Sequence, residues 1–413
     1  MLEIDSTKLK WALSTLLQVA SSSTKKADAG ISLLLRPRVT GGTAAYLATP
    51  GWAYSTSVIY DLGEVSPATC DCGDTTVPSA SWKLLSSMLR KVKGGGSAQV
   101  GVEVVGDSRI STCTLPDGNS LPMRGNSIVF AGLLPENYEP SKAHAVTVKT
   151  ADLQMALSNA LVSAPKVDGC RPALTTVQVT FKPEGMQVYS SDGRRLTRVS
   201  RIPVTVPFKF EEASTSMAVR RSLCAWLAGL RGLDKYTVMS PKTTFVGKGG
   251  SNLTEYQGFS VGPLCVHYLK PDGHFPNLDR TMPQEDAITG SWTLSRETCL
   301  TVLRSVVMTY AATGHDKNDY FPHTVFSYSE EDSSLRVNLC IDAAHIWRIP
   351  ATQTGSPPPK IAFNIEYWIE WLANQDVEKV VVDLADEYHA ARMYPLNDMD
   401  NMYVVMPVRI QRS

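Results

Sequence analysis

The clearest pattern along the chain is an apolar stripe at helical spacing that occurs three times. In the first third, apolar residues from Leu9 to Ala20 recur at intervals of three and four, behind a cap at Thr7. This spacing predicts one apolar face of a helix. Comparable stripes follow Thr150 in the second third and Ser295 in the last third. The nearly even spacing of these caps indicates one structural unit repeated three times.

Each third also contains a second predicted helix and several predicted strands. The second helices are expected after Ser79, Thr215 and Asn364. Alternating or continuously apolar runs predict strands over residues 98–105, 175–181, 185–190, 325–328, 335–341, 377–384 and 403–410. Such a unit predicts the α+β class, in which two helices of about 18 Å each pack on antiparallel sheets.

Two proline-containing joins divide the chain into three predicted domains. The joins lie at 134–140 and 275–283, which gives domains of residues 1–143, 144–284 and 285–413. At roughly 100–200 residues per domain, a chain of 413 residues is expected to form two to four domains. The length therefore agrees with the threefold pattern.

Composition and charge are ordinary for a globular protein. Hydrophobic residues make up 43% of the chain and charged residues 19%, so each domain can bury a core. Lysine plus arginine and aspartate plus glutamate each number 40, and the net charge is zero. This balance excludes a uniformly basic surface that binds nucleic acid by bulk attraction. It allows a segregated basic surface, because charge acts within a Debye length of about 8–10 Å.

The cysteines and the N-terminus argue against a metal site, a secreted protein and a membrane protein. None of the eight cysteines forms a CxxC pair. Cys70 and Cys72 are close in sequence, but the second pair of ligands that a zinc site needs is missing. We therefore expect free, reduced thiols. The first residues do not resemble a signal peptide, and no apolar stretch reaches the ~18–20 residues of a membrane span. The sequence predicts a soluble, cytoplasmic protein without membrane contact.

No catalytic or cofactor motif stands out. The glycine-rich runs 94–97 and 247–251 lack the GK[ST] ending of a phosphate-binding loop. Residues 315–319 include His and Asp, which are residue types that bind metals, but they lack the fixed spacing of metal ligands. Such a segment is typical of a solvated loop. Asp192-Gly193 predicts a hairpin turn. We expect no cofactor, no metal and no enzymatic activity. An enzyme that uses the cleft near 191–195 is the less favoured alternative.

Four segments give the chain a resemblance to a known family. They are Arg171–Thr175 together with Ser191–Leu196, Phe275–Arg280, Phe363–Tyr367 and Tyr403–Ile410. In this order and at these intervals they resemble signatures of the bacterial sliding clamp family, the beta subunit of the replicative DNA polymerase III holoenzyme. The resemblance is good over residues 144–413 and weak over residues 1–143. It leaves open whether the chain is a host clamp, a second copy or a divergent phage-encoded clamp.

The resemblance implies three repeated clamp domains, and a head-to-tail homodimer that closes a six-domain ring around double-stranded DNA. Such a ring is a processivity factor that tethers a polymerase. Its helices face the DNA, and lysine and arginine contact phosphates without reading sequence, which permits sliding. The implied DNA-facing residues are Lys10, Lys25, Lys26, Arg90, Lys91, Lys93, Arg171, Arg220, Arg221, Arg296 and Arg304. Each alone is explained equally well as a solvated charge on a helix face.

The resemblance also implies a pocket that takes short apolar peptide motifs of DNA polymerases and the clamp loader. Its residues are Leu174, Ser191, Gly193, Arg194, Arg195, Leu196, Pro276, Arg280, Thr281, Tyr367, Val404, Val405, Met406, Pro407, Val408 and Arg409. The run 404–408 also fits a buried core strand, and the two roles are compatible. Ser191, Arg194, Thr281 and the tail 411–413 depart from the family pattern, which leaves the choice of partner open.

For the dimer interface, the resemblance points to Ile128 and Phe130 of one chain against Val307 and Met308 of the other. All four residues fit an intramolecular core equally well. A third interpretation is a clamp-fold interaction module that has no role in replication.

Overall fold

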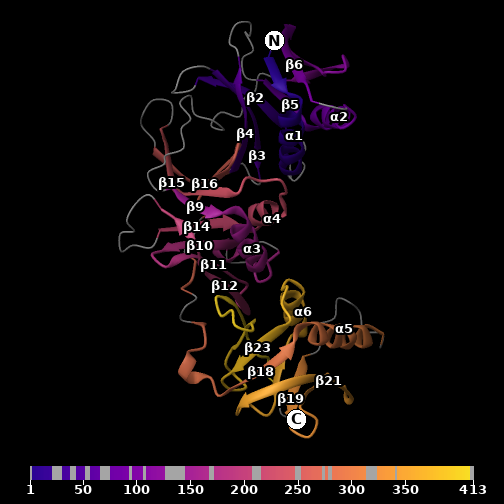
Figure 1. Ribbon diagram of the computed structural model, residues 1–413, viewed down its shortest axis with the longest axis vertical. Coiled ribbons are helices and arrows are strands. Elements are labelled where there is room, and N and C mark those ends of the chain that lie inside the picture. The colour runs from indigo at the N-terminus through magenta and orange to yellow at the C-terminus, as the bar shows by residue number, and fades with distance from the viewer. Residues whose placement is uncertain are drawn as a thin grey trace. The chain divides into compact units, whose positions relative to one another are not determined.

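The structure of the protein is a computed structural model, shown as a ribbon in Figure 1. It describes residues 2–20, 30–37, 43–51, 56–65, 75–92, 95–105, 108–125, 145–166, 172–206, 215–246, 253–271, 275–277, 281–312, 323–339 and 342–409. These residues form six α-helices and three sheets of antiparallel strands. They belong to two compact units, called unit 1 and unit 2.

Unit 1 consists of Met1–Ala151, Val204–Lys209 and Leu230–Lys270. Its helices α1 (Ser6–Ala20) and α2 (Ser79–Leu89) lie side by side (Figure 1). A four-stranded sheet has the order β1 (Leu2–Asp5), β6 (Ser97–Val105), β7 (Ser108–Thr114), β8 (Ser120–Gly125). A nine-stranded sheet has the order β13 (Val204–Thr205), β9 (Val146–Lys149), β15 (Tyr236–Val246), β16 (Leu253–Val261), β17 (Leu264–Leu269), β4 (Thr56–Val65), β3 (Thr43–Gly51), β2 (Gly30–Pro37), β5 (Thr75–Pro78).

Unit 2 consists of Asp152–Pro203, Phe210–Gly229 and Pro271–Ser413. It holds α3 (Thr150–Leu161) except for its first two residues, α4 (Arg221–Gly229), α5 (Arg296–Ala312) and α6 (Ile365–Ala373). Two short 3-10 turns are η3 (Pro172–Thr175) and η5 (Glu285–Ala287). A twelve-stranded sheet has the order β14 (Thr215–Arg220), β10 (Thr176–Lys182), β11 (Gly185–Ser191), β12 (Arg195–Ile202), β25 (Asn401–Val405), β24 (Ala391–Pro395), β23 (Lys379–Leu384), β18 (Gly290–Ser295), β21 (Asp342–Gly355), β20 (Ser334–Leu339), β19 (Thr324–Ser329), β22 (Ile361–Phe363).

Each large sheet joins strands from two of the three predicted domains. In unit 1, β17 pairs with β4, and Leu264 lies opposite Tyr60. In unit 2, β12 pairs with β25, and Leu196 lies opposite Val404. The predicted α+β class is confirmed. The division of the chain near residues 143 and 284 stays a prediction.

Local sequence explains where several helices begin. The side chain of Asn364 accepts a hydrogen bond from a backbone N–H in the first turn of α6, so it caps the helix predicted there. Ser295 lies at the start of α5, also as predicted. At α1 the cap is Asp5, two residues before the predicted one, because its carboxylate accepts hydrogen bonds from the amides of Thr7 and Lys8.

The helix expected after Thr215 begins later than predicted. Thr215–Arg220 forms β14, and α4 begins only at Arg221. Met217 and Val219 are buried and alternate with half-buried neighbours, which is the period of a strand. β14 pairs with β10, and this pairing supplies its backbone hydrogen bonds. Sheet pairing therefore forms a strand where the apolar spacing alone predicted a helix.

Neither a metal centre nor a membrane-spanning helix is present among the described residues. They contain no cluster of His, Cys, Asp and Glu side chains that could hold a metal ion. None of their helices has the length and apolar composition needed to cross a membrane. The cysteines at 113, 224, 265 and 299 are free thiols, and the pair at 70 and 72 lies outside the described residues.

His267 on β17 is expected to make the stability of unit 1 depend on pH. Its imidazole is almost fully buried, and burial lowers its pKa from 6.5 to about 4. Well above pH 6.5 the ring is neutral in both the folded and the unfolded chain. Below that pH the unfolded chain takes up the proton first, which favours unfolding. We expect the free energy of unfolding to fall by about 2 kcal/mol from this residue between pH 7.5 and pH 5.

Urea denaturation at a series of pH values measures this effect. In a His267→Gln variant, the corresponding part of the pH dependence should disappear. A variant whose stability still falls as steeply as that of the wild type would show that other groups cause the loss.

Candidate functional site

A tight turn between β11 and β12 forms the centre of the candidate site. Gly193 has a φ of 89°, which glycine adopts without strain. The Asp192 carboxylate accepts hydrogen bonds from the amides of Arg194 and Arg195 at 2.9 and 3.1 Å. The Ser191 hydroxyl accepts from the Gly193 amide at 3.0 Å and donates to the Arg195 carbonyl at 2.8 Å. The predicted hairpin turn is confirmed, and these bonds fix the direction in which the Arg195 side chain leaves it.

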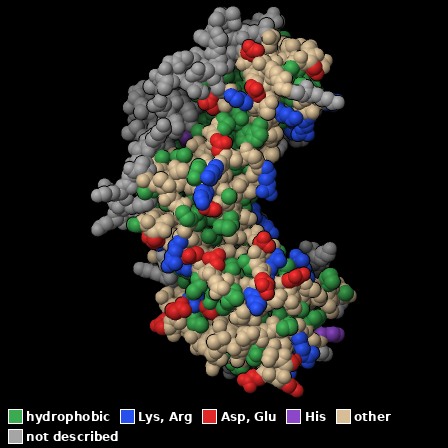
Figure 2. Space-filling view, viewed as in Figure 1, with side chains coloured by type: hydrophobic (Ala, Val, Ile, Leu, Met, Phe, Trp, Pro, Cys, Tyr) green, Lys and Arg blue, Asp and Glu red, His purple; other side chains and the backbone are tan. Residues whose placement is uncertain are grey.

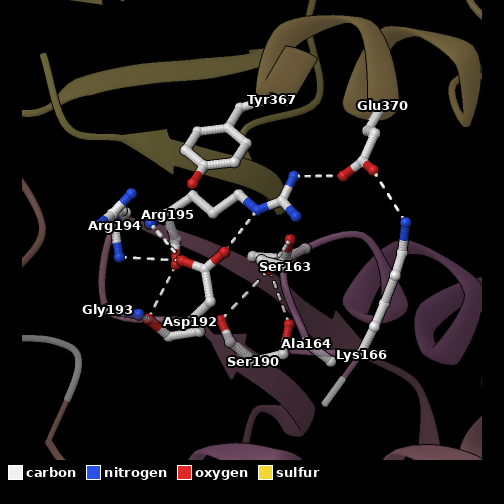
Figure 3. Close-up of polar contacts among 12 residues, drawn as sticks. Ser163, Ala164, Lys166, Ser190, Asp192, Gly193, Arg194, Arg195, Tyr367 and Glu370 are labelled. Carbon is white, nitrogen blue, oxygen red and sulfur yellow. Dashed lines mark hydrogen bonds and ion pairs between the residues drawn. The ribbon is translucent and has the colours of Figure 1, made fainter. Parts of the chain in front are cut away.

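The side chain of Arg195 extends from this turn toward helix α6 (Figure 3). Its Nε donates to Asp192 Oδ2 at 2.9 Å, and its Nη1 donates to Glu370 Oε2 at 2.5 Å. The guanidinium carbon lies 4.2 Å from the centre of the Tyr367 ring, a cation–π contact. Burial works to lower the pKa of Arg195, but the charges and hydrogen bonds of Tyr403 and Glu370 raise it overall. The guanidinium is therefore charged and held in place.

Glu370 connects Arg195 to a second basic residue. Its Oε1 accepts a hydrogen bond from Lys166 Nζ at 3.2 Å, while its Oε2 accepts from Arg195 (Figure 3). Burial works to raise the pKa of Glu370, but hydrogen bonds and charges from Arg195 and Lys166 lower it overall. Neither Glu370 nor Lys166 was predicted from the sequence. Glu370 lies three residues after Tyr367, a spacing that places both on one helix face and was the available signal.

A chain of amide side chains, here called the amide seam, joins α3 to the end of α6 and the start of β25. Asn374 Nδ2 donates to Asn159 Oδ1 at 2.6 Å, and Asn401 Nδ2 donates to Gln375 Oε1 at 2.8 Å. Gln375 Nε2 also donates to the Asn159 oxygen, at 3.5 Å. Asn159 and Gln375 are buried, so these bonds satisfy amide groups that water does not reach.

The C-terminal strand β25 contributes side chains to both faces of the sheet. Val405 belongs to the large core under α5 and α6, whereas Val404 points to the opposite face. Beyond the strand, the Met406 amide donates to the Arg194 carbonyl at 2.9 Å, and the Val408 amide donates to a β22 carbonyl at 2.8 Å. The core-strand interpretation therefore holds for Val405, while Met406 is exposed beside the turn.

A second, smaller apolar cluster lies on the face of the sheet that Val404 occupies. This floor cluster consists of Tyr189, Leu196, Ala390, Met402 and Val404, all buried. Phe275 and Met282, from the chain that joins β17 to β18, are partly buried and pack against it. Two of the predicted pocket residues, Leu196 and Val404, thus form an apolar floor covered by residues from another part of the chain.

The structure brings most of the described pocket residues to the turn or to the floor cluster. The turn holds Ser191, Gly193, Arg194 and Arg195, with Tyr367 against Arg195, and the chain after β25 holds Met406, Pro407, Val408 and Arg409. Pro276 and Thr281 are exposed, and in the sequence they are the neighbours of Phe275 and Met282. Leu174 is half-buried in η3, and Arg280 lies outside the described residues.

The predicted DNA-facing residues have two kinds of surroundings. Lys10, Arg90, Lys91 and Arg304 are exposed, and Arg220 is half-buried. Arg221 at the start of α4 donates from Nε to the Ala164 carbonyl at 3.2 Å, just beyond the end of α3. Arg296 at the start of α5 donates from Nε to the Leu372 carbonyl of α6 at 2.9 Å. Lys25, Lys26, Lys93 and Arg171 lie outside the described residues.

Basic side chains do not cover the surface uniformly. On the face shown in Figure 2, lysine and arginine are interspersed with acidic and apolar side chains. This distribution agrees with the balanced composition of the chain. Any attraction for nucleic acid must therefore come from particular groups of cations.

Two of the four predicted dimer-interface residues are described. Val307 packs partly against the core of unit 2, and its neighbour Met308 is 67% exposed. Ile128 and Phe130 lie outside the described residues. The core interpretation therefore fits Val307. Met308 is exposed, and its place in a dimer interface stays a prediction.

Sequence comparison relates the chain to curated clamp proteins. No sequence profile of a known protein family matches it. A beta sliding clamp of Synechococcus elongatus is 23% identical over 347 residues, covering 82% of this chain and 82% of that protein. A beta sliding clamp of Synechocystis sp. is 23% identical over 366 residues, covering 84% and 86%. The resemblance inferred from the four segments is confirmed.

Solved structures show the same fold over the full chain. The DNA polymerase III subunit beta of Pseudomonas aeruginosa has a TM-score of 0.74 at 15% identity. The alignment covers 99% of this chain and 100% of that one. The beta subunit of Thermotoga maritima gives a TM-score of 0.72 at 16% identity with the same coverage. A further P. aeruginosa clamp, bound to griselimycin, has a TM-score of 0.72 at 15% identity. The α+β fold of this chain is that of a bacterial sliding clamp.

Proposed function

We propose that this chain is a divergent bacterial-type DNA sliding clamp, a non-enzymatic processivity factor that encircles duplex DNA and tethers polymerases. The observation that carries the proposal is the match of the fold over 99% of this chain to DNA polymerase III beta subunits. A clamp needs no catalytic group, because it acts by holding a polymerase near its template.

We propose that a closed ring retains the protein on DNA. The ring consists of two chains, and each chain contributes three clamp domains. A ring retains DNA by topology, so its contacts with DNA can be weak. The exposed cations Lys10, Arg90, Lys91 and Arg304 are suited to this task. Lysine and arginine contact phosphates without regard to sequence, so the protein can slide. Met308, exposed on α5, is proposed to lie in the contact between the two chains.

Partner binding is proposed to use the turn and the floor cluster. Leu196 and Val404 supply an apolar floor, and Met406 is an exposed, flexible apolar side chain beside the turn. Arg195 supplies a fixed charge held between Asp192 and Glu370. A short apolar peptide with one polar anchor would match this combination. The griselimycin complex of a structurally similar clamp supports the presence of a small-ligand site in this fold.

The test is retention of labelled protein on circular DNA. The protein is loaded onto a nicked plasmid with a clamp loader, separated from free protein, and then the plasmid is cut once. We expect the bound half-life to fall at least about tenfold after cutting, because sequence-independent phosphate contacts alone dissociate quickly at physiological salt. The solution mass should correspond to two chains. Equal half-lives on circular and linear DNA would contradict encirclement.

The matched control in this assay is a Met308→Asp variant. A buried charge in the proposed contact should shift the solution mass toward one chain and abolish retention on the circle. The fold of the single chain should persist, because Met308 is 67% exposed. A variant that remains a dimer would remove Met308 from the interface.

A further inference from the structure

One row of cross-strand neighbours in unit 2 leads from the floor cluster to a buried ion pair. Leu196 on β12 lies opposite Val404 on β25, and Val404 lies opposite Arg392 on β24. Arg392 in turn lies opposite Asp383 on β23. Residues opposite each other on neighbouring strands point to the same face of a sheet. Arg392 and Asp383 therefore share the face of the floor cluster and lie directly beside it.

Arg392 makes charged hydrogen bonds to two carboxylates. Its Nη2 and Nε donate to Asp383 Oδ2 at 2.6 and 3.2 Å, and its Nη1 donates to Glu285 Oε2 at 2.8 Å. Only 5% of the Arg392 side chain and 7% of the Asp383 side chain are exposed, whereas 78% of Glu285 is exposed. Asp383 thus neutralises the buried arginine, and Glu285 approaches it from the surface.

Glu285 belongs to a segment that also covers the floor cluster. We call residues 281–287 the wall segment. It contains Thr281, a predicted pocket residue, Met282, which packs against the floor cluster, and the turn η5 that begins at Glu285. The ion pair with Arg392 therefore fixes the wall segment three residues after the point where it contacts the floor.

We infer that Arg392 is a positioning residue for the partner site: through Glu285 it holds the wall segment, and with it Met282, over the apolar floor of Leu196 and Val404. This inference rests on the proposed function, because it treats the floor cluster as part of the partner-peptide pocket. Arg392 itself need not touch the partner.

The two carboxylates give this contact an asymmetry. If Glu285 leaves, Arg392 keeps its buried partner Asp383, so no buried charge is left unpaired. The Glu285 contact is thus free to open and close without disturbing the sheet. Because Glu285 is exposed, dissolved salt screens its attraction to Arg392 and loosens the wall segment.

The test compares Glu285→Gln with a matched control, Asp286→Asn. Asp286 is the neighbouring exposed carboxylate of the same turn and makes no ion pair among the described residues. Hydrogen exchange of peptides covering residues 281–287 is the first measurement. We expect exchange in Glu285→Gln to be about three- to tenfold faster than in the wild type, the range for loss of one charge-assisted hydrogen bond at the surface. The Asp286→Asn protein should exchange like the wild type, and both variants should keep the wild-type urea midpoint.

The second measurement is the affinity for griselimycin, used as the probe of the proposed pocket. We expect Glu285→Gln to bind it several-fold more weakly at low salt, and Glu285→Asp to fall between that variant and the wild type. At high salt the wild type should approach Glu285→Gln.

The outcomes separate this inference from the clamp proposal. Equal exchange in Glu285→Gln and the wild type overturns the anchoring role, while retention on circular DNA decides the clamp independently. Faster exchange with unchanged griselimycin affinity, or no griselimycin binding by the wild type, overturns the connection between the wall segment and the pocket.

Discussion

Replacing Asp383 by leucine is expected to lower the free energy of unfolding by about 3–5 kcal/mol. The change leaves the Arg392 guanidinium buried with only the exposed carboxylate of Glu285 as a partner. Burial of a charge without close compensation is costly, and the hydroxyl of Tyr394 also loses its contact with Asp383 Oδ1. Urea denaturation followed by tryptophan fluorescence measures the loss.

The control for this prediction removes both charges. In an Asp383→Leu, Arg392→Met double variant, most of the lost stability should return, because no buried charge is left unpaired. Glu285→Gln alone should have a far smaller effect on stability, since its side chain is largely exposed. If the double variant were as unstable as Asp383→Leu, the loss would have to come from packing of the leucine and not from the unpaired arginine.

Replacing Trp371 by alanine is expected to lower the free energy of unfolding by about 3–5 kcal/mol. The side chain is fully buried in the core of unit 2 and stacks on Tyr403, with ring centres 5.6 Å apart and planes at 13°. Alanine leaves a cavity at the inner side of α6, the helix that carries Tyr367 and Glu370. We therefore also expect griselimycin binding to weaken in this variant, measured at a temperature where it is still folded.

Trp371→Phe is the matched control. The buried indole Nε1 has no hydrogen-bond partner among the described residues, so phenylalanine removes an unsatisfied donor while keeping an aromatic ring against Tyr403. Its cost should stay below about 2 kcal/mol, the lower range for truncation of a core side chain. A loss as large as that of alanine would mean that the indole nitrogen is satisfied in solution, for example by a water molecule.

Apolar spacing predicted the fold well where a single pattern decides the outcome. The stripe after Ser295 and the one after Asn364 correspond to α5 and α6. At Thr215 the helical spacing was misleading, because Val219 continues the apolar stripe of the following helix and also alternates with Met217 as in a strand, and the pairing with β10 decides. Pairing partners far apart in the chain are not visible in a local pattern.

In the candidate site too, contacts between neighbours in sequence were predictable, and contacts between distant residues were not. The turn at Asp192-Gly193 was predictable, because its hydrogen bonds join neighbours in sequence. The contact of Arg195 with Glu370 joins residues 175 positions apart, and no periodicity indicates it. For the same reason Arg221 was predicted only as a DNA-facing charge, although it also donates to the carbonyl of Ala164.

The amide seam gives α3 and α6 a connection of a different kind from the ion pairs around Arg195 and Arg392. Its four side chains from Asn159 to Asn401 have no net charge and do not titrate. Ionic strength and acidity, which weaken a contact such as that of Glu285 with Arg392, should leave the hydrogen bonds of these amides nearly unchanged. Unit 2 thus contains one contact that responds to dissolved salt and another that does not, and the distance between α3 and the C-terminal end of α6 should be the same in dilute buffer and in concentrated salt.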